Sequence, residues 1–365
     1  MLRGAEGDRQ LRYVVTGGAG FIGSALVRYL VTQVDARVVT VDSLTYAGDV
    51  ARLERVADDP RHRFERLDVN DQAAIEALLH EERPDGVFHL AAETHVDRSI
   101  DGPEAFALSN TLGTLRLLEA TRRYWSGLDE AERAAFRLVN VSTDEVYGSL
   151  GASGVFTEAT PYAPRSPYSA SKAGADHFAN AYFHTYGLPT ITTHSTNNYG
   201  PYQFPEKLLP LALARALAGE SVPLYGDGSN VRDWLHVDDH ARGLELAMRR
   251  GTPGRTYLMG GATELTNRAV LEALLGLLNE LAPAGYDYRE LITYVPDRPG
   301  HDHRYAVDSS AAERELGWRR QVPIEEGLRS TVEWYLANQG WVAAIKDARY
   351  DLGRLGTVGG GEARP

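Results

Sequence analysis

Three glycines near the start of the chain constrain its fold more than any other feature. Gly17, Gly20 and Gly23 have a GxxGxxG spacing. They follow an apolar run at 13–16 and open an amphipathic stretch at 23–34. A strand that turns through glycines into a helix lets a pyrophosphate approach the backbone and rest on the helix N-terminus. Glycines alone would indicate only a turn, but this context predicts a dinucleotide-binding unit.

A carboxylate after the next expected strand indicates which dinucleotide is bound. Asp42 follows the apolar run 37–41, about 20 residues beyond the glycines, which is the usual spacing for a ribose ligand. A carboxylate there accepts hydrogen bonds from both ribose hydroxyls and repels a 2′-phosphate. The sequence therefore predicts NAD as the cofactor rather than NADP.

The first half of the chain alternates short apolar runs with longer amphipathic stretches, which indicates βαβ units. This predicts a Rossmann-type, doubly wound parallel sheet of class α/β. Further strands are expected at 62–67, 86–90 and 136–142, and helices at 70–82, 103–125 and 167–186.

The pattern becomes less regular after residue 190, where prolines and glycines interrupt shorter segments. Helices are expected at 209–218, 237–249 and 267–281. We expect an NAD-binding domain over 12–190, with some later chain returning to it, and a smaller α/β substrate domain over 191–350. The glycine-rich end, 353–365, is expected to be a disordered tail.

Charge and composition exclude several classes of function. The formal net charge is -12 at pH 7, so the overall field disfavours binding to nucleic acid or to an anionic membrane. The 365 residues include no cysteine, which removes disulfides, zinc–thiolate sites and thiol catalysis. The polar first dozen residues do not resemble a signal peptide, and no apolar run approaches the roughly 20 residues of a membrane span. The expected location is the cytoplasm.

Two short motifs supply residues for redox and acid–base chemistry. Tyr168 and Lys172 lie four apart in an expected helix and so share one face. A cation there favours the phenolate and lowers the tyrosine pKa, and such a tyrosine can take a hydroxyl proton while hydride leaves the same carbon. Asp144 and Glu145 follow an expected strand, and crowding of two carboxyls separates their pKa values. The sequence alone leaves open which of the two is the acid.

Together these motifs resemble the extended short-chain dehydrogenase/reductase family. Within it the chain is most similar to the dTDP-glucose 4,6-dehydratases over roughly residues 12–335. The strings that carry this resemblance are DSLTYAG from Asp42, HLAAETHVDRSI from His89, TDEVYG from Thr143, YSASK from Tyr168, NNYGPYQFPEKL from Asn197, RDW from Arg232 and DRPGHD from Asp297.

The resemblance implies a three-step reaction on dTDP-glucose. Tyr168 would take the C4 hydroxyl proton as NAD takes hydride from C4, and Lys172 would hold the nicotinamide ribose. Glu145 would remove the C5 proton and Asp144 would protonate the departing C6 hydroxyl. The hydride would then return to C6, giving the 4-keto-6-deoxy sugar. Thr143 would hydrogen-bond the O4 atom and stabilise the developing ketone.

The resemblance also implies the remaining contacts. Cofactor-binding residues would be Gly17, Gly20, Phe21, Ile22, Gly23, Asp42, Leu44, Thr45, Asp68, Val69, Leu90, Ala91, Ala92, Ser109, Tyr168, Lys172 and Asn198. Substrate-binding residues would be Thr94, Thr143, Asn197, Lys207, Leu208, Pro223, Tyr225, Arg232, Asn267, Arg298 and His301. No metal is expected, because His301 and His303 have no further ligands nearby in sequence. A homodimer with a four-helix interface would use the helices at 103–125 and 167–186, although helices buried within one subunit would show the same apolar pattern.

Two alternatives share part of this pattern. A nucleotide-sugar 4-epimerase or decarboxylase uses the glycine loop, Tyr168 and Lys172, but has no need of Asp144 and Glu145 because it does not eliminate water across C5–C6. A non-catalytic NAD-sensing regulator would need neither Tyr168 nor Lys172. The carboxyl pair therefore favours the dehydratase.

Overall fold

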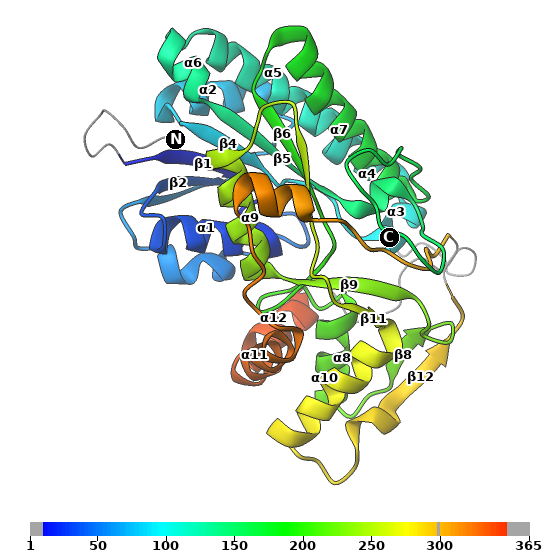
Figure 1. The fold of residues 1–365 in the computed structure, drawn as a ribbon. Helices are drawn as coiled ribbons and strands as arrows, with labels where there is room; N and C mark the ends of the chain where they lie inside the picture. The colour runs from blue at the N-terminus through cyan, green and yellow to red at the C-terminus, as the bar shows by residue number, and fades with distance from the viewer. Residues whose placement is uncertain (1–9, 298–299, 349–365) are drawn as a thin grey trace.

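A seven-stranded parallel sheet is the centre of the first layer of the computed structural model, which describes residues 10–297 and 300–348 (Figure 1). In spatial order its strands are β10 (Thr256–Met259), β6 (Thr190–Ser195), β5 (Arg137–Thr143), β4 (Gly86–His89), β1 (Arg12–Thr16), β2 (Arg37–Val41) and β3 (His62–Glu65). Strand order reverses between β1 and β4, and a doubly wound sheet binds its ligand outside the carboxyl ends of the strands at that point. The expected Rossmann-type fold is confirmed.

Alternate residues of each strand belong to two different cores, because successive side chains of a strand point to opposite faces. On β1, Val15 packs into the core that α1 and α9 cover, whereas Val14 packs into the core that α2, α5 and α7 cover. The helices are α1 (Phe21–Thr32), α9 (Val237–Arg250), α2 (Gln72–Glu82), α5 (Gly113–Ser126) and α7 (Pro167–Tyr186).

The expected helix at 103–125 is divided into three parts. These are α4 (Pro103–Phe106), a π-helical turn (Ala107–Leu112) and α5. The wider turn contains Asn110, whose side chain accepts from Glu93 N at 2.8 Å and donates to Glu93 O at 2.9 Å and Ser171 Oγ at 2.9 Å. π-Turns are frequent at functional sites. Here the turn brings a helix side chain to the loop after β4.

A second layer lies below the carboxyl edge of the large sheet in Figure 1. Its core unites helices and two small sheets around Leu213, Leu224, Trp234 and Leu271. The strands are β7 (Asn197–Tyr199), β9 (Val231–His236) and β11 (Glu264–Thr266) in one sheet, and β8 (Val222–Tyr225) and β12 (Ile292–Val295) in the other. The helices are α8 (Leu208–Leu217), α10 (Asn267–Leu281) and α11 (Ile324–Ala337).

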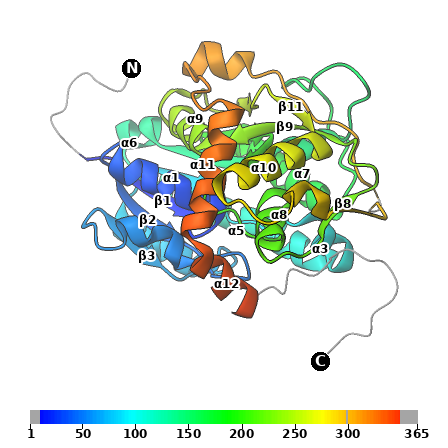
Figure 2. The same cartoon turned by 90° about the horizontal axis from the view of Figure 1, so that it is seen from below.

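The last described helix, α12 (Gln339–Ala348), extends from α11 back towards the first layer (Figure 2). Trp341 Nε1 donates to Asp49 Oδ2 at 2.9 Å, and Ile345 packs with Phe204. The shorter elements are α3 (Val96–Asp101), α6 (Glu130–Ala135), 3₁₀ turns at Val50–Val56, Asp144–Tyr147 and Tyr288–Leu291, and a π-turn at Ala312–Leu316.

The boundary between the layers does not follow a single cut in the sequence. β6 extends to Ser195, and both α9 and β10 come from the later chain but lie on the large sheet. We therefore propose the division into residues 12–190 and 191–350 with these segments assigned to the first domain. The tail expected at 353–365 lies outside the described residues. Within the described ranges, no helix is both long enough and apolar enough to cross a membrane.

Candidate active site

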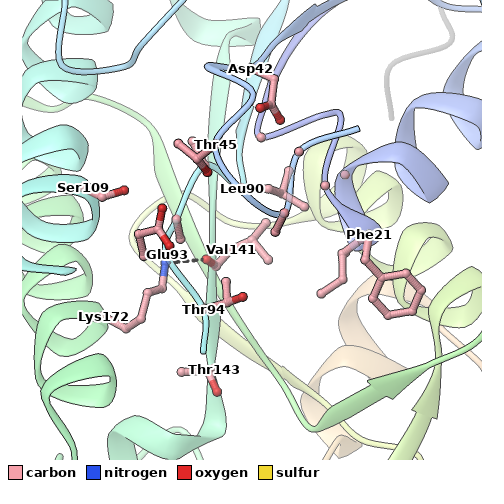
Figure 3. A pocket seen from close by; sticks show the side chains of 18 of the residues that line it. Phe21, Asp42, Thr45, Leu90, Glu93, Thr94, Ser109, Val141, Thr143 and Lys172 are labelled. Carbon is pink, nitrogen blue, oxygen red and sulfur yellow. Dashed lines mark hydrogen bonds between the residues drawn. The ribbon is translucent and has the colours of Figure 1, made fainter. Parts of the chain in front are cut away.

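A cavity of about 540 Å³ lies along the carboxyl edge of the large sheet and reaches the second layer. The glycine loop, the loops after β2 and β4, the end of β5, α7 and the 195–207 segment all line it. Figure 3 shows Phe21 and Lys172 on opposite sides of this cavity, with Thr143 near its lower end. The two sequence motifs therefore open into the same space.

The glycine loop leaves no room for side chains. A Cβ atom on Gly17 would lie 2.6 Å from Ala91 N, and Gly17 also has a positive φ of 68°. A Cβ on Gly23 would lie 2.1 Å from Gly17 O. Because these positions carry no side chain, a pyrophosphate can come close to the backbone at the start of α1.

Asp42 is fixed at the other end of this loop. Its Oδ2 accepts from Ala19 N at 3.0 Å, and its Oδ1 accepts from Leu44 N at 2.8 Å. Burial raises the pKa of Asp42, while these two backbone hydrogen bonds lower it. The carboxylate is therefore oriented by the loop that it borders.

Nearly all residues expected at the cofactor line the cavity. They are Gly17, Gly20, Phe21, Ile22, Gly23, Asp42, Thr45, Asp68, Val69, Leu90, Ala91, Ala92, Ser109, Tyr168, Lys172 and Asn198. Leu44 is not among the lining residues, and its backbone instead holds Asp42.

Thr143, the last residue of β5, begins the turn that contains the carboxyl pair. Its Oγ1 accepts from Glu145 N at 3.3 Å and donates to Asp144 Oδ1 at 3.4 Å. Gly148 closes the turn with a φ of 86°, and a Cβ there would lie 2.6 Å from Ala163 O. Strand, cap and glycine together direct two adjacent carboxyls into the cavity.

Asp144 is only 2% exposed, and its Oδ2 has no hydrogen-bond partner among the described residues. Burial raises the pKa of Asp144 well above its ordinary value, and the negative charge of Glu145 adds to this effect. The positive charge of Arg232 and the Thr143 hydrogen bond oppose the rise. Burial therefore favours the protonated form of Asp144.

Tyr168 and Lys172 lie in the first two turns of α7. Ser166 caps the helix and Pro167 occupies its first turn, which fixes where α7 begins. Tyr168 is 8% exposed, and Lys172 donates from Nζ to Val141 O at 2.9 Å. The expected shared face is confirmed, because both side chains line the cavity.

The expected effect of Lys172 on Tyr168 is not found. Burial, followed by the charge of Glu145, raises the pKa of Tyr168, and only a hydrogen bond with Thr143 among its main influences favours the phenolate. Burial also lowers the pKa of Lys172, although Asp176 opposes this. The expectation was wrong because the ammonium is turned towards a strand carbonyl and both groups are buried.

A buried polar network supports these residues from behind. Asp176 on α7 accepts from Asn140 Nδ2 at 2.8 Å, Ser142 Oγ at 2.8 Å and Tyr162 OH at 3.2 Å. His194 lies 3.0 Å from the same carboxylate and 2.7 Å from Tyr147 OH. The network joins β5, β6 and α7 beneath the reacting groups, so it fixes their relative positions.

Three charged residues of the cavity escaped the sequence analysis. Glu93 projects its side chain into the cavity, and burial raises its pKa. Glu206 accepts from Tyr46 OH at 3.0 Å and from Arg98 Nε at 3.2 Å. Both residues lie inside sequence strings that carry the family resemblance, so the resemblance could have identified them as site residues.

Arg52 gave no sequence signal of its own. It is fully buried and donates to Tyr202 O at 2.9 Å, Ala19 O at 3.0 Å and Ala47 O. Its guanidinium also lies 5.3 Å from the ring of Trp341. A single arginine therefore connects the glycine loop to the second layer and to α12.

The expected substrate residues fall into two groups. Thr94, Thr143, Asn197 and Lys207 line the cavity. Leu208, Pro223, Tyr225, Arg232, Asn267 and His301 lie outside its lining. Arg298 lies outside the described residues.

Members of the second group contact one another and neighbouring segments. Tyr225 OH donates to Asp97 Oδ2 at 3.0 Å, and the rings of Tyr225 and His301 are 6.2 Å apart. Arg232 donates from Nη2 to Asp302 O at 2.9 Å, and its charge reaches Asp144. Across residues 10–297 and 300–348, no cluster of three or more His, Cys, Asp or Glu has metal-binding geometry.

Comparison with known proteins places the chain among sugar-nucleotide dehydratases. Residues 14–331 match the sequence model of the family described as GDP-mannose 4,6 dehydratase. A relative from Sinorhizobium fredii, named a probable dTDP-glucose 4,6-dehydratase, is 53% identical over 348 residues, covering 95% of this chain and 99% of the relative.

Solved structures give the same result. The dTDP-glucose 4,6-dehydratase of Streptomyces venezuelae, crystallised with NAD bound, has a TM-score of 0.85 and 47% identity, covering 92% of this chain and 100% of that one. The enzyme of the same name from Bacillus anthracis, in complex with NAD, has a TM-score of 0.81 and 42% identity, covering 92% and 100%.

Proposed function

The chain belongs to the dTDP-glucose 4,6-dehydratase family of extended short-chain dehydrogenases/reductases, and from this premise we propose that it converts dTDP-glucose to dTDP-4-keto-6-deoxyglucose. It is an NAD-dependent lyase of deoxysugar biosynthesis. One observation carries the proposal above all others. The buried Asp144, Thr143 and the Tyr168–Lys172 pair line the same cavity as a dinucleotide loop.

The residues present fit NAD. The backbone of Gly17, Gly20 and Gly23 would receive the pyrophosphate, and Asp42 would receive the adenosine ribose. Asp68 and Val69 would frame the adenine, while Leu90, Ala91, Ala92, Ser109 and Asn198 would line the rest of the groove. When bound, oxidised NAD supplies a hydride acceptor that returns the hydride within the same turnover, and a ring charge that favours the phenolate of Tyr168.

The oxidation step is assigned to the side chains at the start of α7. Tyr168 takes the proton of the C4 hydroxyl, and Thr143 holds the O4 atom as it becomes a ketone. Lys172, fixed by Val141 O, orients the nicotinamide ribose. A ketone at C4 makes the C5 proton acidic, which prepares the next step.

Elimination of water is assigned to the carboxyl pair. Glu145 removes the C5 proton, and Asp144 donates its proton to the departing C6 hydroxyl. Burial and the charge of Glu145 both raise the pKa of Asp144, which favours the protonated form that a general acid needs. Glu145 returns its proton to C5 when hydride reaches C6.

The carboxyl pair also separates this reaction from its rivals. An epimerase or decarboxylase oxidises C4 with the same Tyr and Lys but eliminates no water. A regulator that only senses NAD needs none of these side chains. The relative named a probable dTDP-glucose 4,6-dehydratase, at 53% identity, favours the dehydratase over both.

We also propose how the substrate is held. Thr94, Asn197 and Lys207 would contact the sugar and its first phosphate. Tyr225, Arg232, Asn267, Arg298 and His301, with Leu208 and Pro223, would surround the rest of the nucleoside diphosphate. The positive charge of Arg232 opposes the rise in the pKa of Asp144, which supports a position of Arg232 near the reacting end of the substrate site.

Assembly and location are further proposals. We propose a homodimer in which α5 and α7 of two copies form a four-helix interface. Tyr186 on α7 is 49% exposed and Leu108, just before α5, is 48% exposed, which supports an apolar contact there. A sedimentation experiment that found only monomer would contradict this. We propose the cytoplasm as the location, which agrees with a chain that has no cysteine to oxidise.

The function is tested by incubating the purified protein with dTDP-glucose and recording the absorbance of the keto sugar in alkali. The wild-type protein should produce this absorbance, and NAD should be neither consumed nor reduced overall. Parallel incubations with UDP-glucose and CDP-glucose test the base. Absence of the absorbance with all three sugars would refute the dehydratase, and conversion to a C4 epimer without it would establish the rival reaction.

A further inference from the structure

His240 is a fully buried histidine that the proposed reaction does not use. It lies near the start of α9 and does not line the cavity. Burial lowers its pKa to about 3, so the ring is neutral at pH 7. Its Nε2 atom has no hydrogen-bond partner among the described residues, and burying a polar nitrogen without a partner costs free energy. An apolar side chain would avoid this cost, so stability alone does not explain a histidine here.

The other ring nitrogen of His240 contacts Asn198 of β7, which does line the cavity. Its Nδ1 lies 2.9 Å from Asn198 Oδ1. On its other side, Asn198 donates from Nδ2 to Ser195 Oγ at 3.1 Å and to Thr196 O at 2.9 Å. A backbone carbonyl only accepts hydrogen bonds, so Thr196 O fixes which end of the amide carries the nitrogen. The amide oxygen therefore faces His240, and Nδ1 of His240 is the donor.

These contacts determine what Asn198 can still bind. An asparagine side chain has two N–H donors and an oxygen with two acceptor positions. Ser195 and Thr196 receive both donors, and His240 fills one acceptor position. The position that remains is an acceptor, and Asn198 is only partly buried in the cavity wall. Asn198 therefore suits a ligand group that donates a hydrogen bond.

We propose that His240 is a positioning residue of the cofactor site: it holds Asn198 as the acceptor for the carboxamide N–H of nicotinamide, an inference that rests on the proposed function. Without His240 the Asn198 amide would be anchored at its nitrogen alone, and its oxygen could swing away. A fixed carboxamide fixes the rotation of the nicotinamide ring. Hydride transfer to and from the sugar depends on that rotation.

Two dinucleotides that differ in one group test the proposal. Acetylpyridine adenine dinucleotide carries a methyl group where the carboxamide of NAD carries NH₂, so it lacks the donor. Protein stripped of bound NAD would be titrated with each dinucleotide and followed by tryptophan fluorescence. His240→Leu removes the donor to Asn198 and should weaken NAD binding by about three- to tenfold, the effect of one neutral hydrogen bond. Binding of the acetylpyridine dinucleotide should be unchanged.

Further variants separate positioning from packing. His240→Asn retains a donor, because its Nδ2 can take the place of Nδ1, and should bind NAD nearly as tightly as wild type. In an Asn198→Ala background, His240→Leu should cause no further loss of NAD affinity. Asn198→Ala alone should distinguish the two dinucleotides as His240→Leu does. That variant leaves α9 intact, so the proposal is tested even if His240→Leu does not fold.

Equal weakening of both dinucleotides by His240→Leu, or by Asn198→Ala where His240→Leu does not fold, would overturn the proposal. So would a further loss of NAD affinity when His240→Leu is added to Asn198→Ala, because His240 would then act by packing. The thermal unfolding midpoint of His240→Leu should not fall, since the variant removes an unpartnered buried nitrogen. These measurements use no sugar. Failure of wild type to make a keto sugar would therefore refute the proposed function separately.

Discussion

Asp144 and Glu145 are neighbours in the chain but meet different surroundings in the fold. Asp144 lines the cavity but is almost fully buried, and one of its oxygens has no hydrogen-bond partner in the described part of the chain. The positive charge of Arg232 is the main charge that opposes the rise in its pKa. Glu145 is only partly buried and lies on the cavity side. Different burial of adjacent carboxyls is a general way to obtain an acid and a base at one pH.

This difference gives a prediction for paired variants. Asp144→Asn should lower the rate of product formation by about 10²- to 10⁴-fold, the usual value of a general acid. It should still exchange the C5 proton of recovered dTDP-glucose with D₂O, because Tyr168 and Glu145 are intact. Glu145→Gln should lose that exchange. Mass spectrometry of the recovered sugar measures the exchange directly.

The two variants serve as controls for each other. Both should retain NAD binding, since neither carboxyl belongs to the glycine loop. Equal loss of C5 exchange in Asp144→Asn and Glu145→Gln would contradict the division of roles. Unchanged exchange in Glu145→Gln would require another base.

Individual residues differ in how well a sequence reveals them. Gly17 and Asp42 were predictable because backbone geometry and ribose recognition restrict those positions to a few residue types. The raised pKa of Asp144 was not predictable, because it depends on burial. Arg52 was hidden for a different reason. Its partners are the backbone carbonyl groups of Ala19, Ala47 and Tyr202. Every residue has such a carbonyl group, so the residue types at these positions do not indicate the contact.

At the level of elements, α12 connects the end of the described chain to the cofactor half. Trp341 donates to Asp49 Oδ2, and Asp49 in turn accepts from Ala51 N to begin the 3₁₀ turn Val50–Val56. That turn carries Arg52, which holds the glycine loop. Helix α12 therefore supports the glycine loop through Asp49 and Arg52.

We predict that Trp341→Phe destabilises the protein by about 1.5–3 kcal/mol, the usual value of a hydrogen bond to a charged group. Phenylalanine keeps an aromatic ring next to Arg52 but is smaller than the indole, so the measured loss includes some packing as well as the hydrogen bond. Urea unfolding measures the loss, and fluorescence titration should show weaker NAD binding as well. Tyr335→Phe, which removes a hydroxyl that donates to Gln203 O, is the matched control for stability without the contact to Asp49. Full stability and NAD affinity in Trp341→Phe would show that α12 does not support the loop.

Elements with a strong period were predicted well. The expected helices at 167–186 and 267–281 are confirmed residue for residue as α7 and α10, and β2 at 37–41 is confirmed likewise. The prediction of a single α-helix at 103–125 was wrong. A π-turn adds a residue to one turn of the helix but leaves the apolar pattern of the sequence in place, so the pattern did not reveal it. Short elements such as α3 have too few residues for the periodic spacing of apolar side chains to be recognised in the sequence.

The pH dependence of stability belongs to the whole molecule. His89 is buried between Thr16 and Thr114, and burial lowers its pKa to about 3, with repulsion from Lys172 adding to the effect. The unfolded chain takes up a proton at this histidine near pH 6.5, whereas the folded protein does not until about pH 3. Below pH 6.5 the unfolded state therefore binds more protons, and stability falls as pH falls.

We predict that His89→Gln reduces this pH dependence. Between pH 6 and pH 4 its free energy of unfolding should fall less steeply than that of wild type, by about 1.4 kcal/mol per pH unit. Buried carboxyls act in the opposite direction, as with Asp233, whose pKa burial raises to about 6. Because they are common to both proteins, comparison of the two isolates the histidine. Urea unfolding at several pH values supplies the slopes.

An exposed histidine provides the control. His184→Gln lies on the surface of α7 and should leave the slope of wild type unchanged. Equal slopes in His89→Gln and wild type would mean that His89 is protonated in the folded protein, and that its contacts with Thr16 and Thr114 are those of an imidazolium.

Arg52 also determines how members of this family can be recombined. A chimera that joins the first 190 residues of one dehydratase to the remainder of another keeps the guanidinium but replaces the backbone turn at Tyr202 that receives it. Any shift of that turn leaves a buried cation short of an acceptor, which is among the costliest defects a protein interior can carry. Breakpoints that keep residues 47–52 and 202 from one parent avoid the defect. Sugar specificity is therefore better exchanged by grafting short loops than by swapping halves.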